Sequence, residues 1–541
     1  MGMFRPLVAL LLFAAAPVAT VAQPAALTPE QAALKAHIQF LAADSLRGRE
    51  AGTRDFDVAA DYVAARMLAA GLKPGGTDGS WFQPVTLTTY RPAERATWTL
   101  RRRGRDVPFL FGKDFVNEPV PSAPDFKAEG EIVFAGYGIV YAAAGRDDYA
   151  GLDVRGKIVA ILAGAPAALP ADVRAHFDDD AQKARLAGAR GAKAVLVLET
   201  AARRRDFSVE SIAPYYAYPR TGWVGPDGAT DDPSPRAPVV GQVSQAGAAK
   251  LFDGAAMRWA EVQAADMRGD RMPTGRLVGH LSVANKTRIA TRDSRNVVGL
   301  IEGRDPTLRG QYVALTAHLD HIGIGREVRG DSIYNGAMDN AAGVSMILEI
   351  ARAIQESGRR PRRSILFLAL TAEEKGLLGS AYFTRYPTVP KGSIVADVNL
   401  DMPILTYPLV DLVVLGGERS SLGPAVAAAA RAEGLGVVPD PEPEEMFFVR
   451  SDHYSFVRAG IPAVSIDTGP GGTGAAAGRT FLNRHYHQPS DQIDLPFDWK
   501  SAVRFKRVAQ ATVLALADAE ARPTWNRGDF FGTMFGGEGG Q

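Results

Sequence analysis

The sequence predicts an α/β protein with a mixed, mostly parallel central sheet flanked by helices, together with a smaller α/β module. From Thr291 onward, apolar strands alternate with helical segments, which is the pattern of a parallel sheet. The strand expected at 364–370 is almost continuously apolar, as strands are when helices cover both faces of their sheet. A chain of 541 residues is also too long for one hydrophobic core, so two or three domains are expected.

The composition is that of an ordinary globular protein. Hydrophobic residues make up 46% of the chain, charged residues make up 22%, and the formal net charge is +1. A balance so close to neutral gives no electrostatic basis for binding nucleic acid, so no such partner is expected. The chain contains no cysteine, which excludes disulfides, thiolate metal ligands and a thiol nucleophile.

The first 22 residues have the pattern of a secretory signal peptide. Arg5 supplies a positive charge, residues 7–16 form an apolar stretch, and the small residues at 20–22 offer a cleavage site. The alternative, a membrane anchor, is disfavoured because the apolar run is short and Pro17 interrupts it. We therefore expect an exported protein, periplasmic or secreted, with no stable membrane anchor after cleavage.

The next segments predict helices followed by a compact module. Two amphipathic helices are expected between Thr28 and Ala70, the first with Thr28 as its N-cap and Pro29 at its first position. From about residue 128 to 283, short strands interleave with helices, which predicts an α/β module. Its clearest elements are strands at 131–140, 156–162 and 194–198 and a helix at 181–189.

The main sheet is expected in the C-terminal half of the chain. Its strands are predicted at 311–317, 364–370 and 394–400, with a helix at 341–355. The residues after Trp525 are rich in glycine, so 526–541 is expected to be a mobile tail.

Six acidic and imidazole residues in this half predict a two-metal site. They are His318, Asp339, Glu373, Glu374, Asp401 and His487. Two imidazoles and three carboxylates can hold two divalent ions if one carboxylate bridges them, and the sixth residue is then free to act as a base. Mixed nitrogen and oxygen ligands suit zinc, and suit cobalt or manganese less well. Paired ions about 3.5–4 Å apart are a recurrent device of hydrolases.

The positions of these residues favour a shared site. His318, the glutamate pair 373–374 and Asp401 each follow closely on one of the expected strands. Because ligand sites in open parallel sheets form outside the carboxyl ends of strands, these side chains should meet at one edge. Each residue alone has an ordinary explanation, such as an N-cap for Asp339. Their conjunction, with every residue of the right ligand type, favours a metal site.

Asp320 adds a further clue, because it lies two residues after His318. An aspartate at that spacing can accept the other N–H of a metal-binding imidazole and fix the orientation of the ring. The alternative is that Asp320 is a turn residue.

These motifs resemble the zinc exopeptidase family that includes bacterial aminopeptidases, plasma glutamate carboxypeptidase, glutamate carboxypeptidase II and the transferrin receptor ectodomain. The catalytic resemblance runs from about Asn296 to Ala519. The segments 41–49 (LAADSLRGR) and 71–74 (GLKP) match the N-terminal helices of this family. The segment 147–157 resembles the protease-associated domain that is inserted in many members.

The resemblance implies a zinc aminopeptidase fold with a discontinuous peptidase domain. That domain would comprise residues 28–120 and 286–525, with the inserted protease-associated domain at 125–285. One zinc ion would be held by His318, Asp339 and Asp401. The other would be held by Asp339, Glu374 and His487, with Asp339 bridging. Glu373 would be the general base and Asp320 the orienting residue.

The chain departs from the family pattern in two places. Many relatives have Gly-Ala-Asp-Asp-Asn where this chain has Met338 in place of the first aspartate, which is not a ligand. The tyrosine that stabilises the oxyanion in the family has no secure counterpart. Arg450, His453 and Tyr454 are the candidates, unless the segment 450–454 is structural.

The expected function is that of an exported di-zinc aminopeptidase acting on short peptides. Carboxylates around the site suit a free amine, whereas a carboxypeptidase needs a cation for the terminal carboxylate, and Arg450 could supply one. A carboxypeptidase or dipeptidase of the glutamate carboxypeptidase type is therefore the alternative. A receptor-like binding protein is disfavoured because all five ligands and the base are present. A serine hydrolase is disfavoured because the chain has no Gly-x-Ser-x-Gly elbow.

Overall fold

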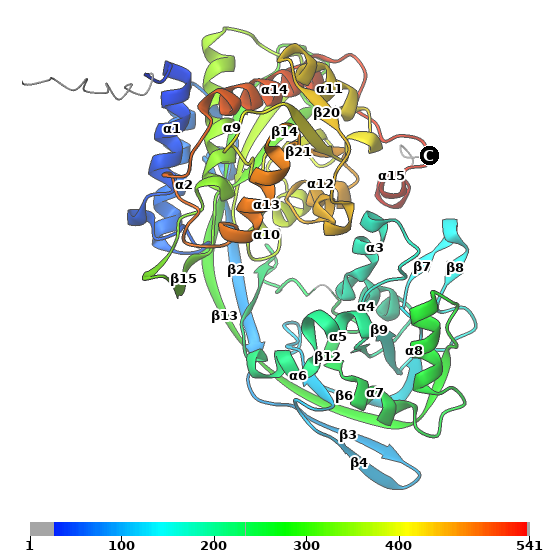
Figure 1. Cartoon of the computed structure of the whole chain (residues 1–541). Helices are drawn as coiled ribbons and strands as arrows, with labels where there is room; N and C mark the ends of the chain where they lie inside the picture. The colour runs from blue at the N-terminus through cyan, green and yellow to red at the C-terminus, as the bar shows by residue number, and fades with distance from the viewer. Residues whose placement is uncertain (1–25, 233, 538–541) are drawn as a thin grey trace, which may run out of the picture.

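The computed structural model describes residues 26–232 and 234–537 (Figure 1). The predicted signal peptide, residues 1–22, lies outside the described residues, so it stays a prediction. Within the described ranges, no helix combines the length and the apolar character needed to cross a membrane.

A mixed sheet forms the centre of the larger part of the molecule and confirms the predicted fold class. Its four middle strands, β17, β14, β18 and β21, run parallel, and antiparallel strands flank them on both sides. In spatial order the strands are β11 (Arg220–Val224), β2 (Phe82–Pro92), β13 (Gly275–Ile301), β17 (Ser364–Leu370), β14 (Tyr312–His318), β18 (Ile394–Asn399), β21 (Ala463–Thr468), β19 (Asp411–Leu415) and β20 (Gly436–Val438). The short β1 (Lys73–Pro74) pairs with the end of β13.

Helices cover both faces of this sheet, as the continuous apolar strands predict. Every residue of β17 is buried, and its apolar side chains alternate between the two hydrophobic cores. One face is covered by α1 (Pro29–Leu41), α2 (Arg54–Ala69), α9 (Gly343–Glu356), α11 (Leu422–Ala432) and α14 (Trp499–Asp518). The other face carries α10 (Leu378–Arg385) and α12 (His453–Arg458). A further helix, α13 (Gly474–Arg484), follows β21.

The helix starts follow their local chemistry. The Thr28 side chain caps α1 by accepting the Gln31 N–H at 3.3 Å, and the Gln31 side chain accepts the Thr28 N–H in return. This reciprocal capping box, with Pro29 at the first position, satisfies donors that a helix start otherwise leaves free.

Glu349 on α9 joins α1 to the core through a buried ion pair. Its Oε1 lies 3.2 Å from His37 Nε2 of α1, and its Oε2 lies 2.7 Å from an Arg352 nitrogen. Burial alone would raise the pKa of Glu349, but the hydrogen bonds from His37 and Arg352 outweigh burial and lower that pKa to about 2. The ionised carboxylate therefore stabilises the folded state.

We expect Glu349→Gln to lower the stability of the metal-free protein at pH 6, and we expect a smaller loss of stability at pH 3. A carboxyl whose pKa is depressed by folding contributes stability above its unfolded pKa and loses it as the pH falls toward the folded value. The window here extends from about pH 4.5 down to about pH 2. Thermal unfolding midpoints of wild type and Glu349→Gln across this range test the expectation. A gap between the two proteins that stayed constant from pH 6 to pH 3 would contradict it.

A second sheet forms the smaller module. Its spatial order is β4 (Arg105–Phe109), β3 (Thr97–Arg102), the first part of β13, β6 (Asp125–Phe134), β9 (Ile158–Leu162), β10 (Ala194–Leu198), β12 (Val239–Val243) and β5 (Phe115–Asn117). Helices α3 (Ala171–Asp178), α4 (Asp180–Ala189), α5 (Ala201–Phe207), α6 (Val209–Ile212), α7 (Gln245–Phe252) and α8 (Trp259–Arg268) surround it. Most elements predicted for the module, including the strands at 156–162 and 194–198, are found within a few residues of their expected positions.

The border between the two parts differs from the expected one. Residues 97–117, which the prediction placed in the peptidase domain, form β3, β4 and β5 of the module sheet. At this first crossing β3 follows β2 after only four residues, 93–96; at the last crossing β13, a strand of 27 residues, belongs to both sheets (Figure 1). It pairs with β3 and β6 in the module and with β2 and β17 in the main sheet. The chain therefore passes from one sheet to the other without a linker that the sequence could reveal.

The glycine-rich end is not a loose tail between residues 526 and 537. It contains α15 (Phe530–Phe535), whose Phe531 is fully buried. Phe531 contacts Phe448 and Tyr454 of the main domain, while Phe530 packs against Phe177 of α3. In Figure 1 this helix lies between α3 and the main domain. The high glycine content predicts a loose tail, but the phenylalanines of the segment hold a helix in place. Residues 538–541 lie outside the described residues.

We expect Phe531→Ala to weaken the attachment of α15 by about 3–5 kcal/mol, the usual loss for removing a buried phenylalanine side chain. The matched control is Met534→Ala in the same helix, because Met534 is 39% exposed and should change stability little. Limited proteolysis of the C-terminal segment, with thermal unfolding, measures the effect. Equal protease resistance of the two variants would contradict the prediction.

Candidate metal centre

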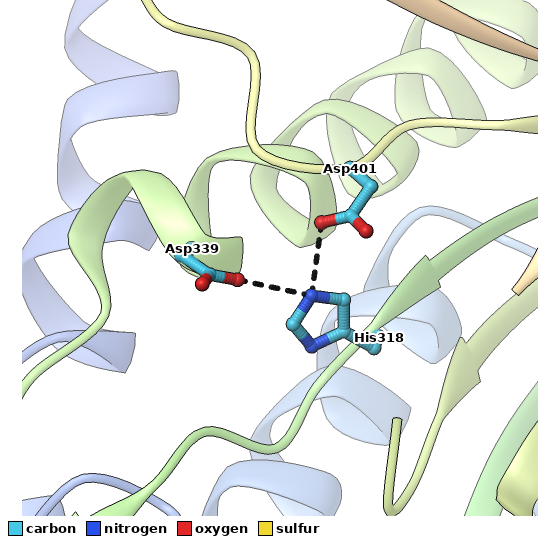
Figure 2. Close-up of side chains that lie close together, drawn as sticks. All are labelled: His318, Asp339 and Asp401. Atoms are coloured by element: carbon cyan, nitrogen blue, oxygen red, sulfur yellow. Dashed lines mark hydrogen bonds and ion pairs between the residues drawn. The ribbon is translucent and has the colours of Figure 1, made fainter. Parts of the chain in front are cut away.

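The structure brings the first three predicted ligands together at the carboxyl edge of the main sheet. His318 is the last residue of β14, Asp401 follows β18, and Asp339 lies in the turn Ala337–Ala342 before α9. His318 Nε2 is 2.9 Å from Asp401 Oδ1 and 3.1 Å from Asp339 Oδ1, as Figure 2 shows. Three separate elements thus deliver one imidazole and two carboxylates to one point, and these atoms could hold one metal ion.

The second group of ligands meets on the other side of Asp339. His487 Nε2 lies 3.3 Å from Asp339 Oδ2 and 3.2 Å from Glu374 Oε2. The two oxygens of Asp339 therefore face different imidazoles, Oδ1 toward His318 and Oδ2 toward His487. This is the arrangement that a bridging carboxylate requires.

The spacing of these donors fits zinc. Two ligands at about 2.0–2.1 Å from a tetrahedral ion lie roughly 3.3 Å from each other. The observed nitrogen-to-oxygen separations are 3.2–3.3 Å at His487 and 2.9–3.1 Å at His318, so the donors lie at or slightly inside that separation. The donor set of imidazole nitrogens and carboxylate oxygens is also one that zinc accepts.

The charges of the group compensate one another in a buried place. Burial lowers the pKa of His487, but its hydrogen bonds to Asp339 and Glu374 outweigh burial and raise that pKa to about 10. Burial and the neighbouring Asp339 raise the pKa of Glu374, whereas hydrogen bonds from His321 and His487 lower it to about 2. Cationic character at the imidazoles thus balances the carboxylates, which is the balance that bound divalent ions also provide.

Glu373 lies beside this group without joining it by an ion pair among the residues that the structure describes. Its side chain lines the same cavity as Asp339 and Asp401. The pKa of Glu373 is raised well above its usual range. Burial is the main cause, and the charges of Asp401 and Glu374 add to it, while His318 acts in the opposite direction. A carboxyl group with a raised pKa at the edge of a metal cluster is suited to accept a proton.

Asp320 supports the site differently from the predicted way. Its backbone carbonyl, and not its carboxylate, lies 3.1 Å from His318 Nδ1. The carboxylate instead accepts the backbone N–H groups of Glu373 at 3.1 Å and Glu374 at 3.4 Å. These contacts place the carbonyl beside the ring and the carboxylate at the residues that follow β17. Asp320 therefore positions the glutamate pair.

Two residues outside the predicted set hold the ligand loops in place. Arg49 is fully buried and donates to the carbonyl of Leu319, which follows His318, at 2.9 Å, and to that of Gly336, three residues before Asp339, at 3.1 Å. Asp491 accepts the backbone N–H of Asp339 at 3.0 Å. Both residues belong to motifs that the sequence contains, LRGR and YHQPSD, but their partners are backbone groups that leave no pattern in the sequence.

His321 and Tyr486 are side chains of the site that the sequence analysis missed. His321 Nδ1 lies 2.6 Å from Glu374 Oε1, and its ring is fully buried. Tyr486 stacks on the ring of His487 with centroids 3.8 Å apart and lines the cavity. Their adjacency to Asp320 and His487 in the sequence was the available signal.

The cavity beside the cluster contains one of the three residues considered for stabilising an oxyanion. Arg450 lines the cavity and is about half exposed. The Tyr454 hydroxyl instead lies 2.7 Å from His176 Nδ1 of α3, and His453 is fully buried. Among the described residues the cavity is lined by Asp339, Glu373, Asp401, Met402, Leu415, Phe447, Arg450, Ser451, Ser465, Asp467, Tyr486 and His487.

Comparison with known proteins matches the segment that carries these residues. Residues 296–513 match the sequence model of Peptidase family M28. A probable leucine aminopeptidase 2 of Aspergillus oryzae is 29% identical over 220 residues, 37% of this chain and 40% of that protein. Leupeptin-inactivating enzyme 1 of Streptomyces exfoliatus is 31% identical over 177 residues, 30% of this chain and 38% of that protein.

A glutamate carboxypeptidase 2 homolog of Caenorhabditis elegans is similar as well, with 26% identity over 209 residues, 34% of this chain and 25% of that protein. The chain thus spans less than half the length of these curated relatives. Among solved structures, an aminopeptidase from Aneurinibacillus sp. strain AM-1 aligns with a TM-score of 0.47 and 21% identity. That alignment covers 91% of this chain and 95% of the other.

Proposed function

We propose that this protein is a di-zinc metallo-aminopeptidase that removes N-terminal residues from short peptides, since residues 296–513 match the sequence model of Peptidase family M28. The observation that carries the proposal is the position of Asp339, whose two oxygens face His318 and His487 from opposite sides. Beside this bridge, Glu373 lines the cavity, and we assign it the role of the base, although it also lies close enough to His318 and Glu374 to share a metal ion with them.

In this proposal each zinc position uses three side chains. The first would be held by His318, Asp339 and Asp401, and the second by Asp339, Glu374 and His487. Zinc ions bound there supply Lewis acidity, which polarises a carbonyl and makes water a better nucleophile near neutral pH.

Glu373 is the proton carrier in the proposed reaction. Its carboxylate takes a proton from water as the water oxygen bonds to the carbonyl carbon of the first peptide bond. The same carboxyl then gives the proton to the leaving nitrogen as the carbon–nitrogen bond breaks. The products are a free amino acid and a peptide shortened by one residue. Asp320 holds the backbone of Glu373 and so fixes the approach of the base.

Tyr486 is suited to stabilise the negative charge that develops on the carbonyl oxygen. Its ring is fixed by stacking on His487, and it lines the cavity that contains Glu373. Burial raises the pKa of the Tyr486 hydroxyl, and Asp339 raises it further, so the hydroxyl keeps its proton and can donate it in a hydrogen bond. Donors directed at a developing oxyanion are among the strongest contributors to catalysis.

The charge of the cavity favours the N-terminal end of a peptide. A free α-amine is cationic at neutral pH and is attracted by Glu373 and Asp401, whereas a terminal carboxylate is repelled by them. Arg450 is the feature that favours the other end, because its guanidinium lines the same cavity and could hold a carboxylate. A carboxypeptidase of the glutamate carboxypeptidase type is therefore the second candidate.

Paired assays distinguish these two functions. We expect the zinc-loaded protein to cleave aminoacyl amides with a free N-terminus and to cleave their N-acetylated counterparts little. If an N-blocked dipeptide with a free carboxylate were the better substrate, and Arg450→Ala removed that preference, the protein would be a carboxypeptidase.

The proposal also includes export and a role for the module. The segment 1–22 supports export to the periplasm or the medium by its sequence pattern. The module contributes no proposed ligand, yet its helix α3 lies against the segment Phe447–Val449 next to the cavity. A wall of this kind would exclude long or folded chains and admit short peptides.

A further inference from the structure

An acidic side chain lies on the wall of the cavity without a role in the proposed chemistry. Asp467 is near the end of β21 and lines the cavity together with Ser465 of the same strand. Side chains two residues apart in a strand share a face, so Asp467 and Ser465 point the same way. The alternate residues Val464 and Ile466 belong to the hydrophobic core on the opposite face. The strand therefore directs Asp467 toward the cavity side of the sheet.

Part of the cavity wall beside Asp467 is apolar. On the neighbouring strand β19, Val413 is directly opposite Asp467 and Leu415 is opposite Ser465. Leu415 lines the cavity, as do Met402 and Phe447. This wall suits the aliphatic part of a long side chain, such as the methylene groups of lysine or arginine.

Asp467 has no cationic partner among the residues that the structure describes. Its Oδ1 accepts the Thr468 N–H at 2.7 Å, but no lysine, arginine or histidine nitrogen lies within ion-pair distance. Burial raises the pKa of Asp467 to about 7; the Thr468 N–H opposes this, and the charges of Asp401 and Asp440 add to it. A carboxylate that is partly removed from water without a counter-ion is destabilised, and a bound cation would relieve that.

A second carboxylate extends this negative character beyond the cavity. Asp440 lines an adjoining cleft of about 610 Å³, and Leu415 lines both the cavity and the cleft. The other acids of that cleft, Asp172 and Glu418, pair with Arg419, whereas Asp440 makes no ion pair among the described residues. Asp467 and Asp440 are therefore two carboxylates without an ion-pair partner among the described residues near this wall of the cavity, which Arg450 also lines.

We infer that Asp467 makes this subsite selective for substrates whose N-terminal residue has a cationic side chain, lysine or arginine. This inference rests on the proposed aminopeptidase function. The side chain would lie along Met402, Leu415 and Phe447 and place its ammonium or guanidinium group at the Asp467 carboxylate. The proposed function assigns the α-amine to Glu373 and Asp401, which line the cavity together with Asp339, so we assign Asp467 to the side chain.

Four p-nitroanilides test the inference, those of lysine, arginine, leucine and norleucine. Norleucine is the matched probe because it has the length of lysine without the charge. We expect wild-type kcat/KM for the lysine substrate to exceed that for norleucine by at least about tenfold, as a charge pair partly shielded from water can provide. Asp467→Asn should bring the ratio close to one by lowering the lysine value alone. The amide oxygen of asparagine can still accept the Thr468 N–H, so the fold of the strand is preserved.

Asp440→Asn is the matched control, since it removes an equal charge from the adjoining cleft and should reduce the ratio only slightly. The inference is overturned if wild type prefers leucine or norleucine, although the aminopeptidase function would then stand. The inference is also overturned if Asp467→Asn lowers kcat/KM equally for all four substrates, because Asp467 would then hold the α-amine that all four share.

If no nitroanilide were cleaved, the proposed function itself would be wrong. A binding measurement then still tests the subsite. Calorimetry with L-lysinamide and L-norleucinamide on the zinc-loaded protein measures the subsite directly. Tighter binding of lysinamide that Asp467→Asn abolishes supports the cationic subsite. Equal binding of the two amides overturns it.

Discussion

Replacing Glu373 by glutamine is expected to lower kcat by about 10²–10⁴-fold, the usual contribution of a positioned general base. Glutamine keeps the shape of the side chain but cannot accept a proton from water. Glu373 makes no ion pair with the imidazoles among the described residues, so the zinc content of the variant should equal that of wild type. Steady-state kinetics and metal analysis on the same dialysed sample measure both quantities.

Glu374→Gln is the matched comparison, because it makes the same chemical change one residue along. Glu374 Oε2 lies 3.2 Å from His487 Nε2 and Oε1 lies 2.6 Å from His321 Nδ1, so the glutamine variant should lose metal. If Glu374→Gln kept its zinc while Glu373→Gln lost it, the roles of the two glutamates would be exchanged.

Asp339→Asn is expected to remove zinc from both positions and to abolish turnover. The asparagine amide has only one oxygen. It therefore cannot present one oxygen on the side of His318 and another on the side of His487. We expect metal affinity to fall by more than about 100-fold, beyond what the loss of an outer hydrogen-bond partner produces. Wild type should retain two zinc ions per chain after dialysis. One tightly bound ion with full activity would contradict the bridging role.

The control for this variant is Asp491→Asn. Asp491 is buried, and its Oδ2 by itself accepts the backbone N–H groups of Asp339 at 3.0 Å and Met338 at 3.2 Å, so the single oxygen of an asparagine in the same position can still accept both. Its zinc content should stay close to that of wild type. A loss of zinc as large as in Asp339→Asn would mean that the loop conformation, and not the bridge, governs metal binding.

The main sheet and the ligand set were predictable because both leave local patterns. The strand at 364–370 is apolar on both faces, and its boundaries in the structure are the predicted ones. His318 and Asp401 were found because a ligand at a strand end is a sequence neighbour of an apolar run. Their convergence followed from the parallel order of the strands.

The supporting contacts were not predictable in the same way. Arg49 donates to backbone carbonyls, and any residue type presents a carbonyl, so its partners have no signature. The carbonyl of Asp320 takes the place expected for its carboxylate, and the carboxylate accepts the backbone N–H groups of Glu373 and Glu374, partners that leave no pattern in the sequence. The border near residue 97 was missed because β3 of the module follows β2 of the main sheet after only four residues, 93–96, and so short a connection does not mark a domain border in the sequence.

The long pairing of β2 with β13 limits how the two parts of the molecule can move. The antiparallel ladder runs without a shift from Phe82 opposite Val297 to Pro92 opposite Thr287, and β13 continues into the module sheet. A hinge needs a few residues whose backbone dihedrals are free to change, and a paired strand offers none. On another side, α15 fastens α3 to the main domain. We therefore expect the entrance to the metal centre to have a fixed width, so that peptides are sorted by size at a rigid opening and not by closure of one domain over the other.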